Sequence, residues 1–171
     1  QTSTTSMDLE VHRRLAFSFE TLQEIWATPV VLDNGNAVFG NQSGELFALT
    51  PSGDQAWSTQ VSAGVYEEIV GDPNNGNFYV GTTDFNVYSF NQDGGQNWVT
   101  ALNGPVGGGV AVASNTYYVA SYTGTLYSLC EGNDCINWSV TLPDKINSTP
   151  VALDSGRVYV GCDDGNLYAF E

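Results

Sequence analysis

The sequence predicts an all-β protein in which four-stranded antiparallel sheets stack radially as the blades of a β-propeller. One pattern recurs four times in the 171 residues, around Gly40, Gly81, Ala120 and Gly161, at intervals of 41, 39 and 41 residues. Apolar residues near these anchors show the period of two that marks strands, and no helical period is sustained between residues 28 and 171. Because one four-stranded sheet buries too little apolar surface alone, about four such blades of roughly 40 residues are expected to stack.

Each repeat has the same parts in the same order. A short apolar segment is followed by a β-rich segment, a polar turn, an alternating segment and a second polar loop. In the last repeat the first four parts read PVALD, RVYVG, CDDGN and LYAF. The turns are rich in Gly, Asn and Asp, which tolerate the positive φ angles of tight hairpins. Each repeat is therefore expected to supply four short antiparallel strands.

Residues 1–27 are expected to form N-terminal strands, as an arm or as part of a closing blade, ahead of the repeats in residues 28–171. Residues 14–20 resemble the alternating segments of the repeats, and Trp26 follows at nearly the spacing of the later tryptophans. The pattern of residues 15–27 therefore predicts that this segment forms the last two strands of a blade.

The chain stops after the third strand of its last repeat, which predicts an open sheet edge there. Unpaired N–H and C=O groups and apolar side chains at such an edge need a cover. We expect the N-terminal segment to supply it, either within one chain, which closes a small ring, or from a neighbouring chain, which builds an oligomer or filament. The residues expected at this assembly edge are Met7, Leu9, Val11, Leu167 and Phe170.

The repeat motif GELFAL, followed by a Gly-containing loop and a Trp, resembles the quinoprotein-like, or PQQ-like, propeller repeat; TLYSL and GNLYAF match it as well. The resemblance covers roughly residues 28–171. It implies a ring of seven or eight blades in a complete protein. It also implies that Trp57, Trp98 and Trp138 dock neighbouring blades, and Trp26 is assigned the same role from its spacing.

Two of the three cysteines, Cys130 and Cys135, bracket the polar loop EGND, so a disulfide between them is expected. Together with the near absence of Lys, the disulfide favours an extracellular, secreted or cell-surface location, with the periplasm as the alternative. Cys162 is left as a free thiol or pairs between chains. The single histidine, His12, and the lack of a second close cysteine pair argue against a zinc site.

The net charge of −15 comes from 19 acidic and 4 basic residues. Such a surface repels phosphate backbones, so we expect no nucleic-acid partner. No apolar run approaches the roughly 20 residues of a membrane helix, so we expect no membrane insertion.

Three segments are candidate catalytic or ligand sites by their composition. Asp163–Asn166 lacks the spaced carboxylates of a calcium loop and occupies a hairpin-turn position. The pair Glu67-Glu68 is expected to be solvated or to line the central channel, and Gly107–Gly109 to allow close backbone packing near the propeller axis. We therefore expect no catalytic residue, no cofactor and no metal.

Three N-glycosylation sequons begin at Asn41, Asn137 and Asn147. Their number is no more than chance produces. Asn137 is the best placed of the three, because it lies beside a tryptophan in an expected outer strand.

Two classes of function remain. The first is a non-enzymatic extracellular or periplasmic propeller module for protein–protein interaction or structural assembly, whose partner is another protein or copies of itself and which polymerises through strand exchange. The PQQ-like family includes such a scaffold, an outer-membrane-assembly lipoprotein. The alternative is a fragment or half of a PQQ-dependent dehydrogenase, although the adjacent-cysteine disulfide that the resemblance implies for those enzymes is missing.

Overall fold

The computed structural model describes residues 15–171, and this part of the chain consists of fifteen strands joined by turns and loops. The first blade contains β1 (Val30–Val31), β2 (Ala37–Gly40), β3 (Glu45–Leu49) and β4 (Gln55–Gln60). The second contains β5 (Val70–Gly71), β6 (Phe78–Gly81), β7 (Asn86–Phe90) and β8 (Gln96–Ala101). The third contains β9 (Val106–Ala113), β10 (Thr116–Ser121), β11 (Thr125–Leu129) and β12 (Ile136–Thr141), and the fourth β13 (Val151–Ala152), β14 (Val158–Gly161) and β15 (Leu167–Phe170).

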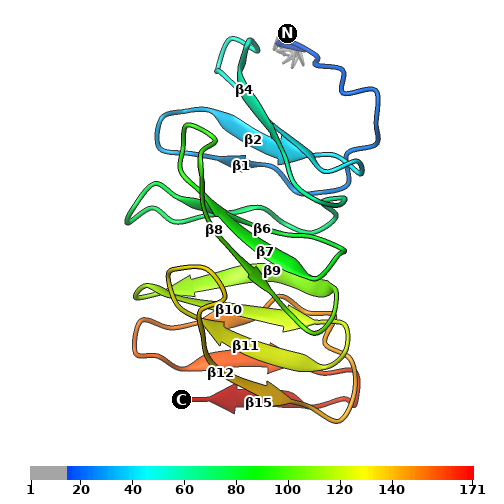
Figure 1. Ribbon diagram of the computed structural model, residues 1–171, viewed down its shortest axis with the longest axis vertical. Helices are drawn as coiled ribbons and strands as arrows, with labels where there is room; N and C mark the ends of the chain where they lie inside the picture. Colours follow the sequence, from blue (N-terminus) through cyan, green and yellow to red (C-terminus); the bar gives the residue numbers. More distant parts are fainter. Residues whose placement is uncertain (1–14) are drawn as a thin grey trace, which may run out of the picture.

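All neighbouring strands are antiparallel and consecutive in the chain, giving three four-stranded sheets and one three-stranded sheet. The sheets follow one another in chain order, with the first and fourth blades at opposite ends of the stack (Figure 1). The first strands of successive blades, β1, β5, β9 and β13, contact one another along the inner side. The architecture is a β-propeller of four blades, as the sequence predicted, and the last blade has three strands.

Three apolar clusters fill the three spaces between consecutive blades. Between the first two blades, Val38 and Leu46 face Phe78 and Val80. Alternate residues of a strand face opposite sides of its sheet, so each inner blade contributes one set of side chains to each neighbour. The stability of the propeller therefore depends on contacts between blades. The described residues include no helix long and apolar enough to span a membrane.

One backbone hydrogen bond recurs in every blade and joins the linker that leads into the blade to the turn between its second and third strands. In the first blade the N–H of Gln42 donates to the carbonyl of Glu24 over 3.0 Å. The corresponding bonds join Thr83 to Gly64, Tyr122 to Pro105, and Asp163 to Lys145. These bonds define which residues are equivalent in the four blades.

The structure has no strand between residues 15 and 29, so the two strands predicted for residues 15–27 are absent. Phe19 lies instead on the free face of the first blade, with its ring centroid 6.1 Å from Phe39 and 5.5 Å from Phe47. A side chain that packs on the face of a sheet holds its backbone away from the edge, where ladder hydrogen bonds form.

The described part of the N-terminal segment thus covers the first blade, far from β15 at the other end of the stack (Figure 1). The expectation that this part of the chain closes onto its own C-terminal edge is therefore wrong. The predicted strand around Met7, Leu9 and Val11 lies outside the described residues.

Candidate functional site

The tryptophans of the repeats lie at equivalent register positions on the outer strands β4, β8 and β12. Trp98 is buried, and its ring centroid is 5.4 Å from that of Tyr117 in the next blade. Trp57 is half-buried, stacks on Phe78 of the next blade at 5.8 Å, and donates from Nε1 to the carbonyl of Gln92 over 3.0 Å. Both side chains therefore bridge two blades, as expected of a docking residue.

Trp138 bridges the third and fourth blades. Its ring centroid is 6.0 Å from Tyr118 and 6.1 Å from Phe170. Phe170, which the sequence placed at the assembly edge, thus faces the third blade and contributes to the interface between the last two blades. Leu167, on the same strand, points to the opposite face of the sheet and is 73% exposed.

Trp26, for which the spacing predicted the same docking role, does not lie on an outer strand. It is 62% exposed and meets only one aromatic ring, that of Tyr66, edge-to-face at 5.2 Å, among the described residues. Trp26 lies two residues after Glu24, just as Tyr66 lies two residues after Gly64, and both carbonyls accept the recurring hydrogen bond. This tryptophan therefore lies in the linker that leads into the first blade, at the position that Tyr66 has in the next linker.

Cys130 and Cys135 form a disulfide with their Cα atoms 5.2 Å apart. The loop that it closes lies on the outer edge of β8 in the preceding blade. The side-chain oxygen of Asn133 accepts from the N–H of Val99 over 3.0 Å, and the N–H of Asp134 donates to the carbonyl of the same residue over 3.2 Å. The disulfide loop therefore covers part of an exposed strand edge, a contact that the sequence did not predict. Cys162 is a free, buried thiol.

Asn41 is not available for glycosylation, because its side chain is completely buried. Its Oδ1 accepts hydrogen bonds from the backbone N–H groups of Ser43 and Glu45, both over 3.0 Å, so the amide closes the β2–β3 turn. The other two sequons begin at exposed residues, Asn137 on β12 and Asn147 in the linker to the fourth blade.

The segments that the sequence offered as candidate catalytic or ligand sites lie in a hairpin turn and in a closely packed strand. Asp163–Asn166 lies in the β14–β15 hairpin turn, where the hydroxyl of Tyr168 donates to Asp164 over 2.6 Å and lowers the pKa of that carboxyl. In β9, a Cβ atom added to Gly107 would lie 2.4 Å from the carbonyl oxygen of Ile146. Close backbone packing between the third and fourth blades thus requires glycine there, as predicted. The described residues contain no group of three or more His, Cys, Asp or Glu side chains placed to hold a metal.

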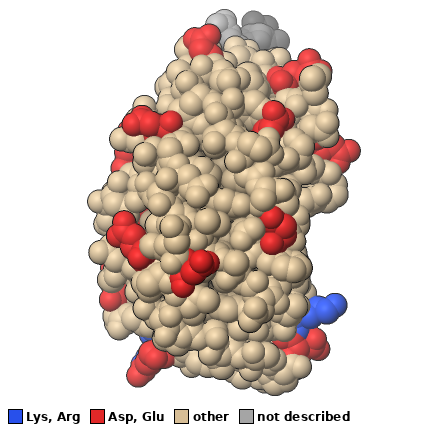
Figure 2. Space-filling model, in the orientation of Figure 1, with Lys and Arg blue, Asp and Glu red and all other residues tan. Residues whose placement is uncertain are grey.

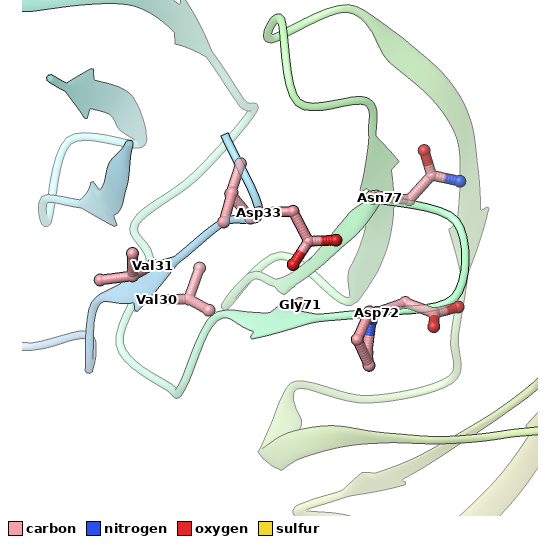
Figure 3. A pocket seen from close by; sticks show the side chains of 9 residues that line it. Val30, Val31, Asp33, Gly71, Asp72 and Asn77 are labelled. Carbon is pink, nitrogen blue, oxygen red and sulfur yellow. The ribbon is translucent and has the colours of Figure 1, made fainter. Parts of the chain in front are cut away.

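A small cavity of about 100 Å³ lies between the inner strands of the first two blades (Figure 3). Asp33 and Asp72 both line it, but their carboxylates point in different directions. Asp72 is 3% exposed and accepts at Oδ1 from the backbone N–H of Asn74 over 2.9 Å, so it stabilises its own loop. The cavity is therefore a packing feature between two blades.

The last blade leaves one apolar face open. Val151, Tyr159 and Ala169 are in register on this face, and Leu167 lies beside them. Val151 is 61% exposed and Leu167 is 73% exposed. The equivalent face of the third blade, with Tyr118, is buried under the fourth blade. The open face of β13–β15 is thus an interblade surface without a covering blade among the described residues.

Comparison with known proteins places this fold in one family. The family model described as "Outer membrane protein assembly factor BamB", a PQQ-like repeat model, matches residues 9–100 and 83–171. No match was found among curated proteins.

Many solved structures share the fold, and three of them are compared with this chain. The structure of BamB from Moraxella catarrhalis superposes with a TM-score of 0.72 at 21% identity, covering 89% of this chain and 48% of that one. The computationally designed Ika4 protein gives a TM-score of 0.76 at 14% identity, covering 88% of this chain and 92% of Ika4. The designed Ika8 protein gives 0.74 at 14% identity, covering 85% of this chain and 45% of Ika8. The chain therefore spans about half the length of BamB, and by its repeats and its fold it belongs to the PQQ-like repeat family of outer membrane protein assembly factor BamB.

Proposed function

We propose that this chain is a non-catalytic protein-interaction and assembly module, and that a second copy of the chain docks on the open face of its fourth blade. The observation that carries the proposal is the exposure of Val151 and Leu167 on a face whose equivalent in each earlier blade is buried by the next blade. The surface that fits such a face is another blade with the same repeat chemistry.

A second copy offers an apolar surface at the other end of its stack. There, Leu15 is 82% exposed and Leu22 is 83% exposed, in the N-terminal segment that packs on the first blade through Phe19. A head-to-tail contact would bury this surface against Val151 and Leu167 of the neighbour. Two four-bladed copies joined at both ends would make one closed ring, whereas a contact that does not close would make a filament.

The family supports an assembly role, since its model is described as an outer membrane protein assembly factor. Two carboxylates of the candidate segments have partners of their own, since Asp164 accepts from the hydroxyl of Tyr168 and Glu67 accepts from that of Tyr122. The disulfide between Cys130 and Cys135 supports a location outside the cytoplasm, extracellular or periplasmic.

The test is the mass of the protein in solution. Sedimentation of the wild type over a range of concentrations is expected to show dimers or larger species. Leu167→Asp places a charge on the open face and is expected to leave only monomers, because an unpaired charge buried in an interface is strongly unfavourable.

The matched control is Ile136→Asp, which also replaces an exposed apolar residue but lies on the outer strand β12. It should associate like the wild type. A wild type that is monomeric at every concentration, or a Leu167→Asp protein that associates normally while folded, would contradict the self-assembly proposal.

A further inference from the structure

A second cleft, of about 290 Å³, opens beside the turns between the second and third strands of the blades. Three blades contribute to it. Its walls include Trp26 from the first linker, Tyr66 and Glu67 from the second linker, Val106 at the start of β9 and Tyr122 after β10. The cleft thus combines three aromatic side chains with one carboxylate, and none of its lining residues is basic.

The repeats provide an internal control for what the fold itself requires at these positions. The recurring hydrogen bond shows that Tyr122 is equivalent to Gln42, Thr83 and Asp163 in the other blades. All three are polar and none is aromatic. The turn therefore forms without an aromatic side chain, and the tyrosine is an addition at this blade.

The same comparison applies to the linkers. Trp26 and Tyr66 are equivalent to Gly107 in the third blade and Asn147 in the fourth. Glu67, one residue further, is equivalent to three small residues, Ala27, Gly108 and Ser148. The aromatic residues of two linkers, one tyrosine of a turn and one carboxylate therefore meet in one cleft, although the third and fourth linkers and the other turns are built without them.

The side chains around the cleft are held in place. The rings of Trp26 and Tyr66 stand at 86° to each other with centroids 5.2 Å apart, so they form a corner. A Cβ atom on Gly64 would come within 2.6 Å of the Tyr66 ring, which shows how closely that ring lies on bare backbone.

The hydroxyl of Tyr122 donates to Oε1 of Glu67 over 2.9 Å. Burial and this carboxylate raise the pKa of Tyr122, so its hydroxyl keeps the proton that it donates. The bond orients the carboxylate of Glu67 at the cleft while Trp26, at 62% exposure, leaves much of its ring open to a ligand.

We infer that this cleft binds an organic cation, the quaternary or methylated ammonium group of a small molecule or of a modified lysine side chain. Aromatic rings attract such cations through their negative faces, and a carboxylate adds direct charge complementarity. Ligand sites usually measure roughly 300–1,000 Å³, so a cleft of this size suits a compact head group rather than a large ligand.

The test uses choline and its uncharged isostere 3,3-dimethyl-1-butanol, which have nearly the same shape, with calorimetry as the readout. Choline is expected to bind the wild type about tenfold more tightly than the isostere, a ratio that corresponds to about 1.4 kcal/mol of cation–π attraction. Glu67→Gln keeps the size of the side chain but removes its charge and should weaken choline binding about tenfold. Trp26→Ala should weaken it to a similar extent.

The matched control is Glu68→Gln, since Glu68 is the adjacent carboxylate and does not line the cleft. This variant should bind choline like the wild type. A peptide that contains trimethyl-lysine is the second ligand to be tested. If the protein binds this peptide and does not bind choline, the result would support the inference and assign the cation to a protein side chain.

Equal affinity for choline and its isostere would overturn the inference, as would the absence of binding to both choline and the peptide or an equal loss in Glu67→Gln and Glu68→Gln. Circular dichroism of each variant separates lost binding from lost folding. The inference does not rest on the proposed assembly role, because the cleft and the open face of β13–β15 use different residues. A Leu167→Asp monomer should still bind choline.

Discussion

Phe85 has a backbone conformation that the other blades give to glycine. Its φ is 77°, whereas the equivalent turn residues are Gly44, Gly124 and Gly165, with φ angles of 84°, 85° and 87°. A positive φ is unfavourable for a bulky side chain, because its Cβ approaches the backbone. The ring of Phe85 is 44% exposed, so packing compensates only part of this strain.

Phe85→Gly is therefore expected to stabilise the protein. Backbone strain of this kind costs roughly 1–3 kcal/mol, and the added freedom of glycine in the unfolded chain offsets roughly 0.5–1 kcal/mol of the relief. We expect the free energy of unfolding, measured by denaturant titration, to rise by about 1 kcal/mol.

The opposite change provides the control. In Gly124→Ala the new Cβ would lie 2.4 Å from the carbonyl oxygen of Asp144, and this variant should be destabilised. An unchanged or lower stability of Phe85→Gly would show that the phenylalanine ring contributes more by packing than its conformation costs.

The disulfide loop is an element that belongs to one blade and protects another. It closes next to β12, yet its residues bind the outer strand of the second blade. Besides the bonds to Val99, the side chain of Asp134 accepts from the N–H of Ala101 over 3.3 Å. Outer strands have unpaired N–H and C=O groups that can recruit other chains, and covering them is a common protection against aggregation.

Replacing both cysteines by serine is expected to lower the free energy of unfolding by about 2 kcal/mol, the entropy expected for closing so short a loop. The freed loop should also release β8. Amide hydrogen exchange at Val99 and Ala101 should therefore accelerate more than exchange in β7, which is paired on both sides. Uniform acceleration across the blade would indicate global destabilisation without a specific edge contact.

Over the whole molecule, negative charge greatly exceeds positive charge. Figure 2 shows acidic side chains spread over the visible face, without one concentrated patch. Near the C-terminus Arg157 forms an ion pair with Glu171, but the chain has only 4 basic residues for 19 acidic ones. A net charge of −15 destabilises the compact state by self-repulsion.

Sodium chloride should therefore raise the melting temperature, because salt screens repulsion between exposed charges over roughly 10 Å at 0.1 M. Each kcal/mol of relieved repulsion corresponds to a rise of about 2–4 °C for a domain of this size. Thermal unfolding at 10 mM and 500 mM salt measures the effect, with an uncharged osmolyte at equal osmolality as the control. A melting temperature that falls with salt would show that attractive pairs outweigh the repulsion.

The features that the sequence determined by itself are those with local causes. Each of these features depends on fewer than about ten consecutive residues: a strand with a period of two, a turn containing Gly, Asn or Asp, or a short loop between two cysteines. Repetition of these signals four times then specifies the blade and the stacking of blades. This is why the strands, the β14–β15 turn, the disulfide and the glycines at Gly107–Gly109 could be predicted.

Only the tertiary structure decided the features that depend on which surfaces meet. Residues 15–20 have the pattern of a strand, but the exposed face of the first blade offers Phe19 more apolar contact than an edge would. Asn41 matches a glycosylation motif, but its turn buries the amide. The aromatic cleft gathers Trp26, Tyr66 and Tyr122 from three blades, and its only trace in the sequence is their departure from the repeat. Such contacts join residues dozens of positions apart in the sequence, so they stabilise the protein only once the blades have stacked.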